Sequence, residues 1–550
     1  MITITQQDGG TFKVKEGTTL REFWEQLEEK PEDIEPVGAV LNQGVLTMMQ
    51  ELLTEDASLV WVDRRSPEGF HIYRQSIIML LLKACSELFP DRRMIIQHTI
   101  SNGIFCEFAN VDTNEEEIRA LTARMEEFVA ADLPIHLVKM NSAEASELFR
   151  KQRHYDTAEL MRLYPKETVT LHEMDGYYDF FIFDVLDHTG TLKWFRLLPY
   201  ENGLVLQTPE EYAGELIGFH EQKKLHHILK IAADRDAIMH TRTAIGVNYY
   251  TRSGRIDDLI RICEAAQDKE IARIADEICS DDRVQLVMIA GPSSSGKTSF
   301  AQKLSIQLRV NHKKPMTISM DNYFVDRDKT PRDEKGEYDF ENLDALDVEL
   351  FNQHLVQLLN GESVQLPVYD FIQGRRRPDG PVIKLEPGQP LVIEGIHGLN
   401  ERLTFRVPRE QKRLIYISAL TQLNLDFSNT ILTSDCRLLR RIARDNRTRG
   451  HSVQDTIRRW PSVRRGEKKN IFVFQENADI YFNSELIYEL TVLKPIVEPL
   501  LLSVKPTEPE YVQASRLLRF LHYILPVENP RVPYQSIVRE FLGGSWYDVE

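Results

Sequence analysis

Short apolar runs of strand type alternate with helical stretches through the C-terminal part of the chain. The runs cover residues 285–290, 316–320, 391–393, 414–418 and 486–490. This alternation is typical of α/β proteins, in which helices cover both faces of a parallel sheet. We therefore expect a doubly wound parallel sheet from residue 284 onward.

The first 63 residues show a different pattern. Residues 2–5 and 11–14 alternate like the two strands of a hairpin around a glycine turn, and a helix is expected to begin near Leu20. Further strands are expected at 37–41, 45 and 59–62. A single helix among short strands is a β-grasp-like pattern.

The middle of the chain changes character twice. Residues 64–220 predict an α+β unit, with helices at 72–88 and 115–131 and strands at 178–186 and 203–207. Residues 221–283 are mostly helical and charged, which predicts either a connector packed on one or both neighbours or a solvated helical spacer. The chain is thus expected to be multidomain, with a β-grasp domain at 1–63, an α+β domain at 64–220, a helical connector at 221–283, an α/β domain at 284–505, and a helical tail without assigned chemistry at 506–550.

Composition limits the class of protein. Acidic residues number 84 against 67 lysines and arginines, which gives a formal net charge of −17 and disfavours broad nucleic-acid binding. No apolar run approaches the ~20 residues that span a bilayer, and the start lacks the pattern of a secretory signal. The five cysteines include no C-x-x-C pair, which indicates reduced thiols. We expect a cytoplasmic protein with no membrane segment.

The expected strand at 285–290 leads directly into GPSSSGKT, residues 291–298. This G-x-x-x-x-G-K-[ST] pattern, followed by a helix expected from Ser299, predicts a phosphate-binding loop. The backbone N–H groups and the helix N-terminus would face phosphate oxygens, Lys297 would reach the β- and γ-phosphates, and the Thr298 hydroxyl could ligate Mg²⁺. A nucleoside triphosphate is therefore expected to bind here.

Two acidic residues are expected at the carboxyl edge of the same sheet. Asp321 ends the expected second strand, and Glu394 ends the strand in LVIEG. Phosphoryl transfer needs a metal to neutralise charge and a base to orient the acceptor hydroxyl. One carboxylate near Mg²⁺ and one near the acceptor would supply both, whereas the alternative is that each acid only caps a helix.

Six arginines fall within the thirteen residues 437–449. A guanidinium presents a fork of donors that suits phosphate oxygens, and it keeps its charge. In an acidic protein such a cluster predicts a lid over a triphosphate. The alternative is a solvated basic face.

Taken together, six motifs resemble those of the uridine–cytidine kinases in the phosphoribulokinase/uridine kinase family. They are GPSSSGKT, SMDNYF, YDFENLDALD, LPVYDF, LVIEG and RRIARDNRTRG, in this order, within about 284–500. The resemblance implies ATP- and Mg²⁺-dependent phosphorylation of a nucleoside 5′-hydroxyl, with Asp321 as the general base. Lys297 and Arg444 would be catalytic as well, since they would stabilise charge on the transferring group.

The phosphate-loop pattern and the resemblance together give the residues expected in each part of the site. The expected ATP-binding residues are Gly291, Pro292, Ser293, Ser294, Ser295, Gly296, Lys297, Thr298, Ser299, Arg444 and Arg449. The expected nucleoside-binding residues are Asp321, Phe340, Glu341, Tyr369, Phe371 and Arg441. The expected Mg²⁺ ligands are Thr298, Glu394 and Asp321.

Four positions depart from the family. Gly374 stands where the pyrimidine kinases carry a histidine that reads the base, Phe324 where tyrosine is usual, Glu341 where aspartate is usual, and His451 where arginine is usual. The resemblance thus carries over the phosphate and hydroxyl chemistry but not the pyrimidine preference. A kinase acting on another small hydroxyl acceptor, such as a sugar phosphate, is the alternative.

The N-terminal half resembles parts of threonyl-tRNA synthetases. Residues 1–63 are similar to a TGS domain. Residues 64–220 resemble the editing-type second additional domain, through ACSELFP, SNGIFCEF and YDFFIFDVLDHTG. The family's H-x-x-x-H and C-x-x-x-H groups fall on Gln75 and Met79 and on Phe181 and Val185, so editing activity is not expected. This resemblance leaves RNA binding by the N-terminal half open, although the acidic composition argues against a strong electrostatic RNA footprint. The third hypothesis is an RNA- or ribosome-associated regulator whose P-loop senses a nucleotide; Asp321 and the arginine cluster argue against it. An oligomer is also compatible with the sequence.

Overall fold

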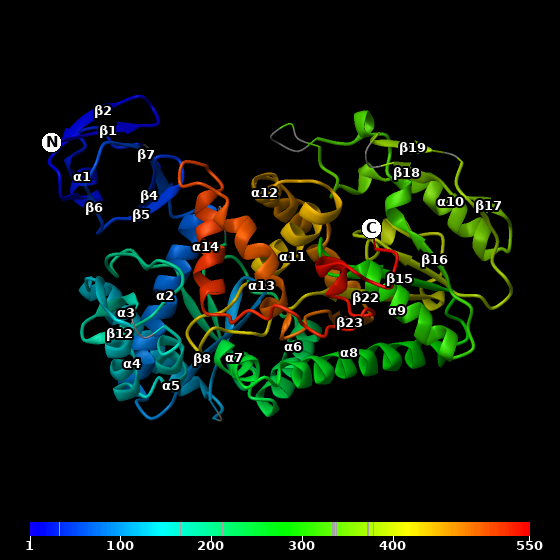
Figure 1. Cartoon of the computed structure of the whole chain (residues 1–550), viewed down its shortest axis with the longest axis horizontal. Coiled ribbons are helices and arrows are strands. Elements are labelled where there is room, and N and C mark those ends of the chain that lie inside the picture. Colours follow the sequence, from blue (N-terminus) through cyan, green and yellow to red (C-terminus); the bar gives the residue numbers. More distant parts are fainter. Residues whose placement is uncertain are drawn as a thin grey trace.

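The computed structural model describes residues 1–31, 33–109, 111–164, 167–210, 214–332, 336, 338–370, 373–377 and 379–549. The N-terminal sheet and the C-terminal parallel sheet lie toward opposite ends of the longest axis (Figure 1). The long helix α8 (Ile256–Cys279) runs along one side of the molecule toward the parallel sheet.

The N-terminal sheet is built from the first 63 residues. Its strand order is β2 (Thr11–Val14), β1 (Ile2–Gln6), β7 (Ala57–Asp63), β4 (Pro36–Leu41) and β5 (Val45–Met48), with a separate short pair β3 (Thr18–Thr19) and β6 (Leu52–Leu53). The expected hairpin is confirmed by the antiparallel pairing of β1 with β2. Helix α1 (Leu20–Gln26) begins where expected, because Thr19 and Glu22 form a capping box.

The following α+β region contains two antiparallel sheets. Their strand orders are β13 (Arg196–Tyr200), β14 (Gly203–Gln207), β9 (Gly103–Phe108), β8 (Met94–Ile100), and β10 (His136–Asn141), β11 (Thr168–Met174), β12 (Tyr177–Asp179). The helices are α2 (Pro67–Leu88), α3 (Glu115–Ala131), α4 (Ser142–Lys151) and α5 (Tyr155–Met161). The strand at 203–207 and the helix at 115–131 are confirmed.

The strand expected at 178–186 is wrong beyond Asp179. The backbone there bonds to side chains rather than to a neighbouring strand. The Ile182 N–H donates to Asn429 Oδ1 at 3.0 Å, and the Phe180 carbonyl accepts from Asn429 Nδ2 at 2.8 Å. Asn429 belongs to the loop 424–429, which follows a strand of the C-terminal sheet, so a contact distant in sequence overrides the local strand pattern.

The connector packs on both of its neighbours and is not a solvated spacer. Helix α6 (Lys223–Ile238) contacts both β8 of the N-terminal half and β23 (Ile480–Asn483) of the C-terminal sheet. Helix α7 (Ala244–Arg252) packs against α5, and α8 packs against α9 (Lys297–Val310).

The C-terminal sheet has five parallel strands, as expected. Their order is β16 (Met316–Ser319), β21 (Leu391–Glu394), β15 (Leu286–Ala290), β22 (Lys412–Ser418), β23. Alternate residues of β15 enter two cores. Leu286 and Met288 pack in the core that includes α6 and α10 (Val348–Leu359), whereas Val287 and Ile289 pack with α8 and α9. Both faces of the sheet are therefore covered by helices.

The strand expected at 486–490 is wrong. The fifth strand is Ile480–Asn483, and Leu486 lies in a turn before helix α13 (Glu489–Leu502). A short apolar run does not distinguish a buried strand from the start of a buried helix. Two short antiparallel pairs complete the described strands: the hairpin β18 (Val368–Asp370) with β19 (Arg375–Arg377), and the flanking pair β17 (Val364–Gln365) with β20 (Val382–Ile383).

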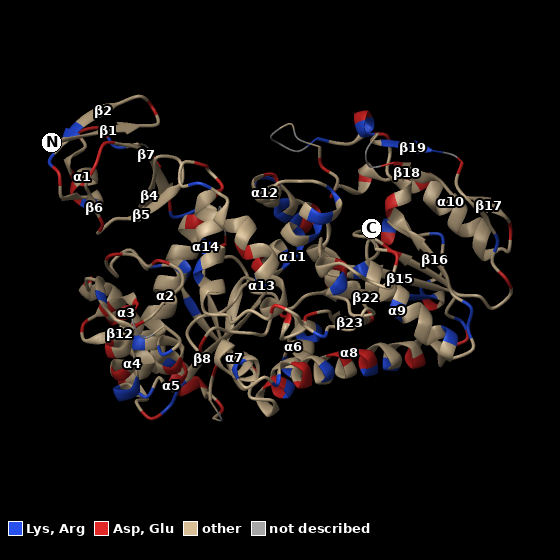
Figure 2. Ribbon diagram, in the orientation of Figure 1, with Lys and Arg blue, Asp and Glu red and all other residues tan. Residues whose placement is uncertain are grey.

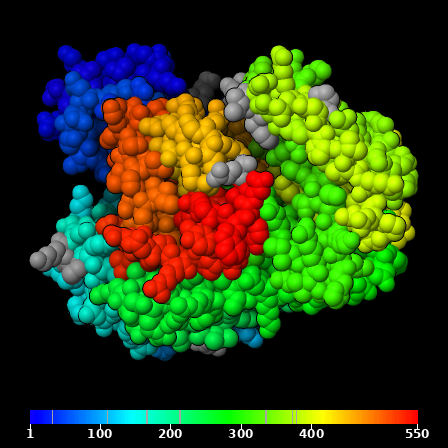
Figure 3. All heavy atoms as spheres, turned by 45° about the vertical axis from the view of Figure 1, so that its right-hand side comes forward, coloured from blue at the N-terminus to red at the C-terminus, as the bar shows by residue number. Residues whose placement is uncertain are grey.

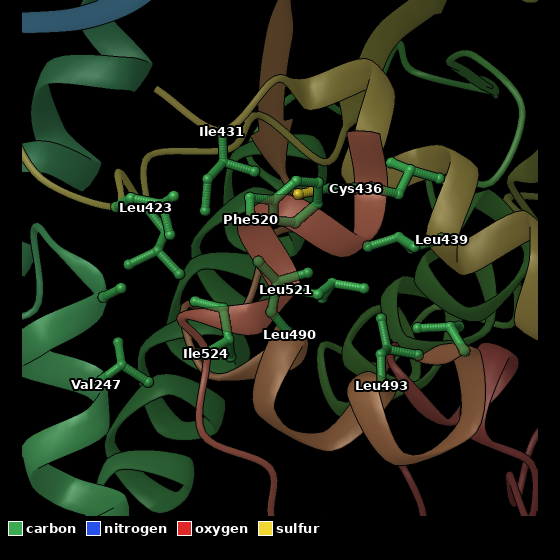
Figure 4. Close-up of a cluster of buried hydrophobic side chains, with 14 of the residues drawn as sticks. Val247, Leu423, Ile431, Cys436, Leu439, Leu490, Leu493, Phe520, Leu521 and Ile524 are labelled. Carbon is green, nitrogen blue, oxygen red and sulfur yellow. The ribbon is translucent and has the colours of Figure 1, made fainter. Parts of the chain in front are cut away.

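One hydrophobic core is shared by segments between residues 145 and 541. Helices α11 (Thr433–Thr448), α12 (Val453–Asn470), α13 and α14 (Tyr511–His522) and the short α15 (Arg539–Leu542) contribute to it. Val247 of the connector, Leu423 beside the parallel sheet and Phe520 of the tail lie together in this shared core (Figure 4). Residues 145–183 of the α+β region pack in the same core. Among the described helices, none is long and apolar enough to cross a membrane.

Candidate active site

The phosphate-binding loop curls between β15 and α9. An alanine methyl group at Gly291 would lie 1.9 Å from the Ile417 carbonyl oxygen, so only glycine fits there. Ser294 and Gly296 have left-handed backbone conformations, with φ of +59° and +83°. Helix α9 begins at Lys297, two residues earlier than expected. The first N–H groups of a helix have no partner within it, so this turn can bind an anion.

Buried charged residues form hydrogen bonds with the backbone of the loop from the core side. Arg437 Nε donates to the Ser293 carbonyl at 2.9 Å, while the Ser293 N–H donates to Glu467 Oε1 at 3.0 Å. Arg437 and Glu467 also form an ion pair, and both side chains are almost completely buried. Arg440 is buried as well; it pairs with Glu489, and its Nη1 donates to the Ser294 carbonyl at 3.4 Å. These two arginines therefore support the loop, which corrects the expectation that the whole arginine cluster forms a lid. Arg437 and Arg440 both lie on the face of α11 that packs in the core.

The register of the parallel sheet brings the expected acids together. Ser319 of β16 lies opposite Glu394 of β21, and Ser319 Oγ donates to Glu394 Oε1 at 2.9 Å. Strand β16 ends at Ser319, so Asp321 does not end the strand but lies in the 3₁₀ turn Met320–Tyr323 that follows. Its own N–H donates to Ser319 Oγ at 3.4 Å. Asp321 and Glu394 therefore lie at the same carboxyl edge of the sheet, beside the loop.

The charges of Lys297, Asp321 and Glu394 influence one another. Burial raises the pKa of Glu394 to about 7, with a further rise from Asp321 and an opposing pull from Lys297. Burial also raises the pKa of Asp321, against the pull of Lys297. The pKa of Lys297 is lowered by burial, and the two acids oppose that shift. Lys297 Nζ donates to the Pro292 carbonyl at 3.1 Å.

The outward arginines of α11 surround one carboxylate. Arg441 Nε and Arg444 Nη2 donate to Asp445 at 3.1 and 2.8 Å, and Arg449 lies 3.7 Å from it. Arg444, with burial, lowers the pKa of Arg449 to about 10. Lysines and arginines gather on α11 and α12 (Figure 2). Arg444 and Arg449 also oppose the rise in the pKa of Asp321 that burial causes, so their charge reaches the acid cluster.

An aromatic cluster forms around Phe324, three residues after Asp321. The Phe324 ring lies 5.9 Å from that of Phe340 and 5.6 Å from that of Tyr369. The Tyr369 N–H donates to Asn322 Oδ1 at 3.3 Å, which ties this strand to the segment after Asp321. Burial raises the pKa of Glu341 to about 7, with Arg441 opposing. The expected nucleoside-binding residue Phe371 lies outside the described residues.

The oxygen donors at this edge fit Mg²⁺. Thr298, Asp321 and Glu394 would offer one hydroxyl and two carboxylates, the hard oxygen ligands that Mg²⁺ prefers. In the part of the chain that the structure describes, no three or more His, Cys, Asp or Glu residues form a group that could hold a metal by themselves. Mg²⁺ in kinases commonly takes one or two carboxylates together with substrate phosphates, so this donor set suits an ion shared with the triphosphate.

Sequence reasoning missed three residues that act on the loop or the acids. Ser319 holds Glu394, Glu467 holds Ser293, and Glu540 accepts from the Ser299 hydroxyl at 2.8 Å. Pairing the two expected strands in register would have found Ser319. No local signal marks Glu467 or Glu540, which lie 174 and 241 residues from their partners.

Two separate regions of this chain are similar to known proteins. A uridine kinase of Chloroflexus aurantiacus is 33% identical over 198 residues, which are 36% of this chain and 85% of that relative. A uridine kinase of Lactobacillus helveticus is 30% identical over 176 residues, 32% of this chain and 74% of that relative. A solved structure of a possible uridine kinase from Bacillus stearothermophilus covers 39% of this chain and 99% of its own, with 20% identity and a TM-score of 0.26.

The N-terminal region matches a different class of protein. A threonine–tRNA ligase of Alkalilimnicola ehrlichii is 28% identical over 199 residues, which are 36% of this chain but only 31% of the ligase. The family model described as the phosphoribulokinase/uridine kinase family matches residues 286–485. With this match, and with a uridine kinase covered over 85% of its length at 33% identity, the chain belongs to the phosphoribulokinase/uridine kinase family.

Proposed function

We propose that the protein transfers the γ-phosphate of ATP to the 5′-hydroxyl of a nucleoside in a Mg²⁺-dependent reaction. The observation that carries this proposal is the meeting of Asp321 with Lys297 and Glu394 beside the phosphate-binding loop. A site that only senses a nucleotide would need no acid placed to receive a proton from an acceptor.

Different residues of the chain carry out different parts of this reaction. The loop N–H groups and Lys297 hold the β- and γ-phosphates, and Arg444 and Arg449 approach the transferring group from α11. The hydroxyl oxygen of the acceptor attacks the γ-phosphorus while the bond to the bridging β–γ oxygen breaks, so ADP leaves. The Asp321 carboxylate takes the hydroxyl proton. Mg²⁺, held by Thr298 and the acids, would neutralise charge on the phosphates.

Replacing Asp321 with Asn tests this assignment. Asparagine keeps the size of the side chain but cannot accept the proton, so kcat should fall by about 10²–10⁴-fold while the Kd of Mg-ATP changes little. The matched control is Asp328→Asn, an exposed carboxylate in the same segment. Both quantities come from steady-state assays with labelled ATP and from titration calorimetry. Full turnover in Asp321→Asn would remove the proposed base.

A phosphorylated acceptor is the second candidate, and one observation favours it. Gly374 has φ of +66°, and a methyl group there would lie 2.7 Å from the guanidinium carbon of Arg327. The Arg327 N–H also donates to the Gly374 carbonyl at 2.8 Å. The Arg327 guanidinium thus fills the space that a side chain at position 374 would occupy. A guanidinium in this position would suit a phosphate on the acceptor. A panel of nucleosides, nucleotides and sugar phosphates with labelled ATP separates the two candidates.

For the N-terminal half, we propose a TGS-like domain at 1–63 and an editing-type domain without editing chemistry at 64–220, followed by the connector, kinase and tail regions at 221–283, 284–505 and 506–550. The four positions expected to carry the editing groups, Gln75, Met79, Phe181 and Val185, are all buried. Three of these side chains are apolar and Gln75 carries a neutral amide, so none supplies the histidine or cysteine groups that the editing site needs. Incubation with mischarged tRNA should give no release of the amino acid above the rate without protein.

A further inference from the structure

The C-terminal tail reaches the phosphate-binding loop. Glu540 Oε2 accepts hydrogen bonds from Ser299 Oγ at 2.8 Å and from the Ser299 N–H at 3.4 Å. Ser299 is fully buried and Glu540 is only 6% exposed. This tail lies beyond residues 286–485, the part of the chain matched by the family model.

Several contacts fix the tail on both helices of the site. Ile537 packs so closely on Gly296 that a methyl group at the glycine would lie 2.5 Å from the Ile537 side chain. Arg447 Nη2 of α11 donates to the Glu540 carbonyl at 2.9 Å, and the Arg440 guanidinium lies 4.9 Å from the centre of the Phe541 ring. The C-terminal part of the chain, red in Figure 3, forms part of the molecular surface, whereas Ile537, Glu540 and Phe541 are buried beneath it. The position of Glu540 is therefore set by the loop and by the arginine helix together.

The donors that Glu540 uses are those of the first turn of α9. In a phosphate-binding loop the backbone N–H groups around the helix N-terminus receive the α- and β-phosphates. A carboxylate and a phosphate oxygen need the same N–H and O–H groups, and two anions repel each other when they are held this close. The charge of Glu540 also acts on the rest of the site, because it works to raise the pKa of both Lys297 and Glu394.

We propose that Glu540 belongs to the donor site and sets its affinity for the nucleoside triphosphate: its carboxylate occupies the Ser299 donors that the α-phosphate requires, so the donor binds by displacing it. The proposal rests on the proposed function in one respect, namely that the loop binds a triphosphate. The backbone carbonyl of Glu540 accepts from Arg447, so a shift of the tail backbone on displacement would change a contact of the arginine helix. Donor binding is thereby linked to the position of α11.

The test compares Glu540→Gln with wild type in the full chain, without acceptor. Glutamine keeps an oxygen that can accept from Ser299 but removes the charge, so the Kd of Mg-ATP measured by calorimetry should fall at least about tenfold, which corresponds to about 1.4 kcal/mol. The matched control is Glu528→Gln, an exposed tail carboxylate, whose Kd should stay within about twofold of wild type. Thermal melting without nucleotide should be similar for all three proteins.

A second measurement uses the wild type alone. Amide hydrogen exchange of residues 533–547 should increase when Mg-ATP is added, since the tail gives up its contact with Ser299. Equal or weaker ATP binding in Glu540→Gln, or slower exchange in the tail, would overturn the inference and leave the proposed function standing. Absence of ATP binding in the wild type and in Glu540→Gln alike would overturn both, whereas binding only in Glu540→Gln would support both.

Discussion

The buried pair beneath the phosphate-binding loop gives the most quantitative prediction. Replacing Glu467 with Gln removes its charge and keeps its shape. Burial acts to raise the pKa of Glu467, but Arg437 and Arg464 outweigh it and hold that pKa below its ordinary value, so the side chain is ionised in the folded protein. The variant therefore leaves Arg437 charged and 1% exposed, without its carboxylate.

The expected cost follows from that unpaired charge. Breaking a buried ion pair by removing one partner destabilises a protein by about 3–5 kcal/mol. The amide oxygen of glutamine can still accept from the Ser293 N–H, so this hydrogen bond is kept and adds little to the cost. Arg464 also loses a partner, but its side chain is 27% exposed and water can solvate it. We expect the free energy of unfolding to fall by about 3 kcal/mol, a large share of the total for a typical folded protein.

Urea unfolding followed by tryptophan fluorescence measures this change. Trp460 is a suitable probe, since its ring lies 5.4 Å from the Arg437 guanidinium. The control is Glu277→Gln on α8, which breaks an exposed i,i+4 pair with Arg273 and should cost less than about 0.5 kcal/mol. Adding Arg437→Met to Glu467→Gln removes the unpaired charge and should recover at least about 1 kcal/mol. A loss below about 1 kcal/mol in Glu467→Gln, or strict additivity in the double variant, would refute the reasoning.

Three further outcomes are expected. Gly291→Ala should weaken Mg-ATP binding by more than about 100-fold, because its methyl group would meet the Ile417 carbonyl oxygen, whereas Gly218→Ala, where that methyl group meets open space, should bind normally in the same titration. Burial raises the pKa of Asp426 to about 7 from an ordinary value near 3.8, so the folded state keeps a proton that the unfolded state loses. The free energy of unfolding should therefore fall between about pH 4 and pH 7, by up to about 4 kcal/mol relative to Asp426→Asn, and parallel pH curves for the two proteins in urea unfolding would contradict this. Removing Mg²⁺ with EDTA should abolish transfer from ATP, and activity that persists in EDTA would argue against the metal.

The sequence predicts the parts of the site that depend on local pattern. The loop, its strand and its helix follow from a contiguous motif, and the acids follow from where strands end at a parallel sheet edge. Asp321 lies two residues beyond the end of β16 and does not end the strand as expected, yet it lies at the same edge of the sheet.

The remaining features depend on contacts between distant segments. The strand expected at 178–186 stops at Asp179 because the backbone beyond it forms hydrogen bonds with the Asn429 side chain. No property of those nine residues indicates this contact. Arg437 and Arg444 belong to one motif, but only the packing of α11 decides that Arg437 turns inward toward Glu467. Helical spacing gives the faces of α11 but not which face meets the core.

The shared core has a consequence for synthesis on the ribosome. Apolar residues between 145 and 183 pack in one core with residues 514–541, so this core cannot be completed until that later segment has left the exit tunnel. Domains usually fold in order as they emerge. Here the segment 145–183 must wait for α14 and for residues 538–541 before its share of this core is complete.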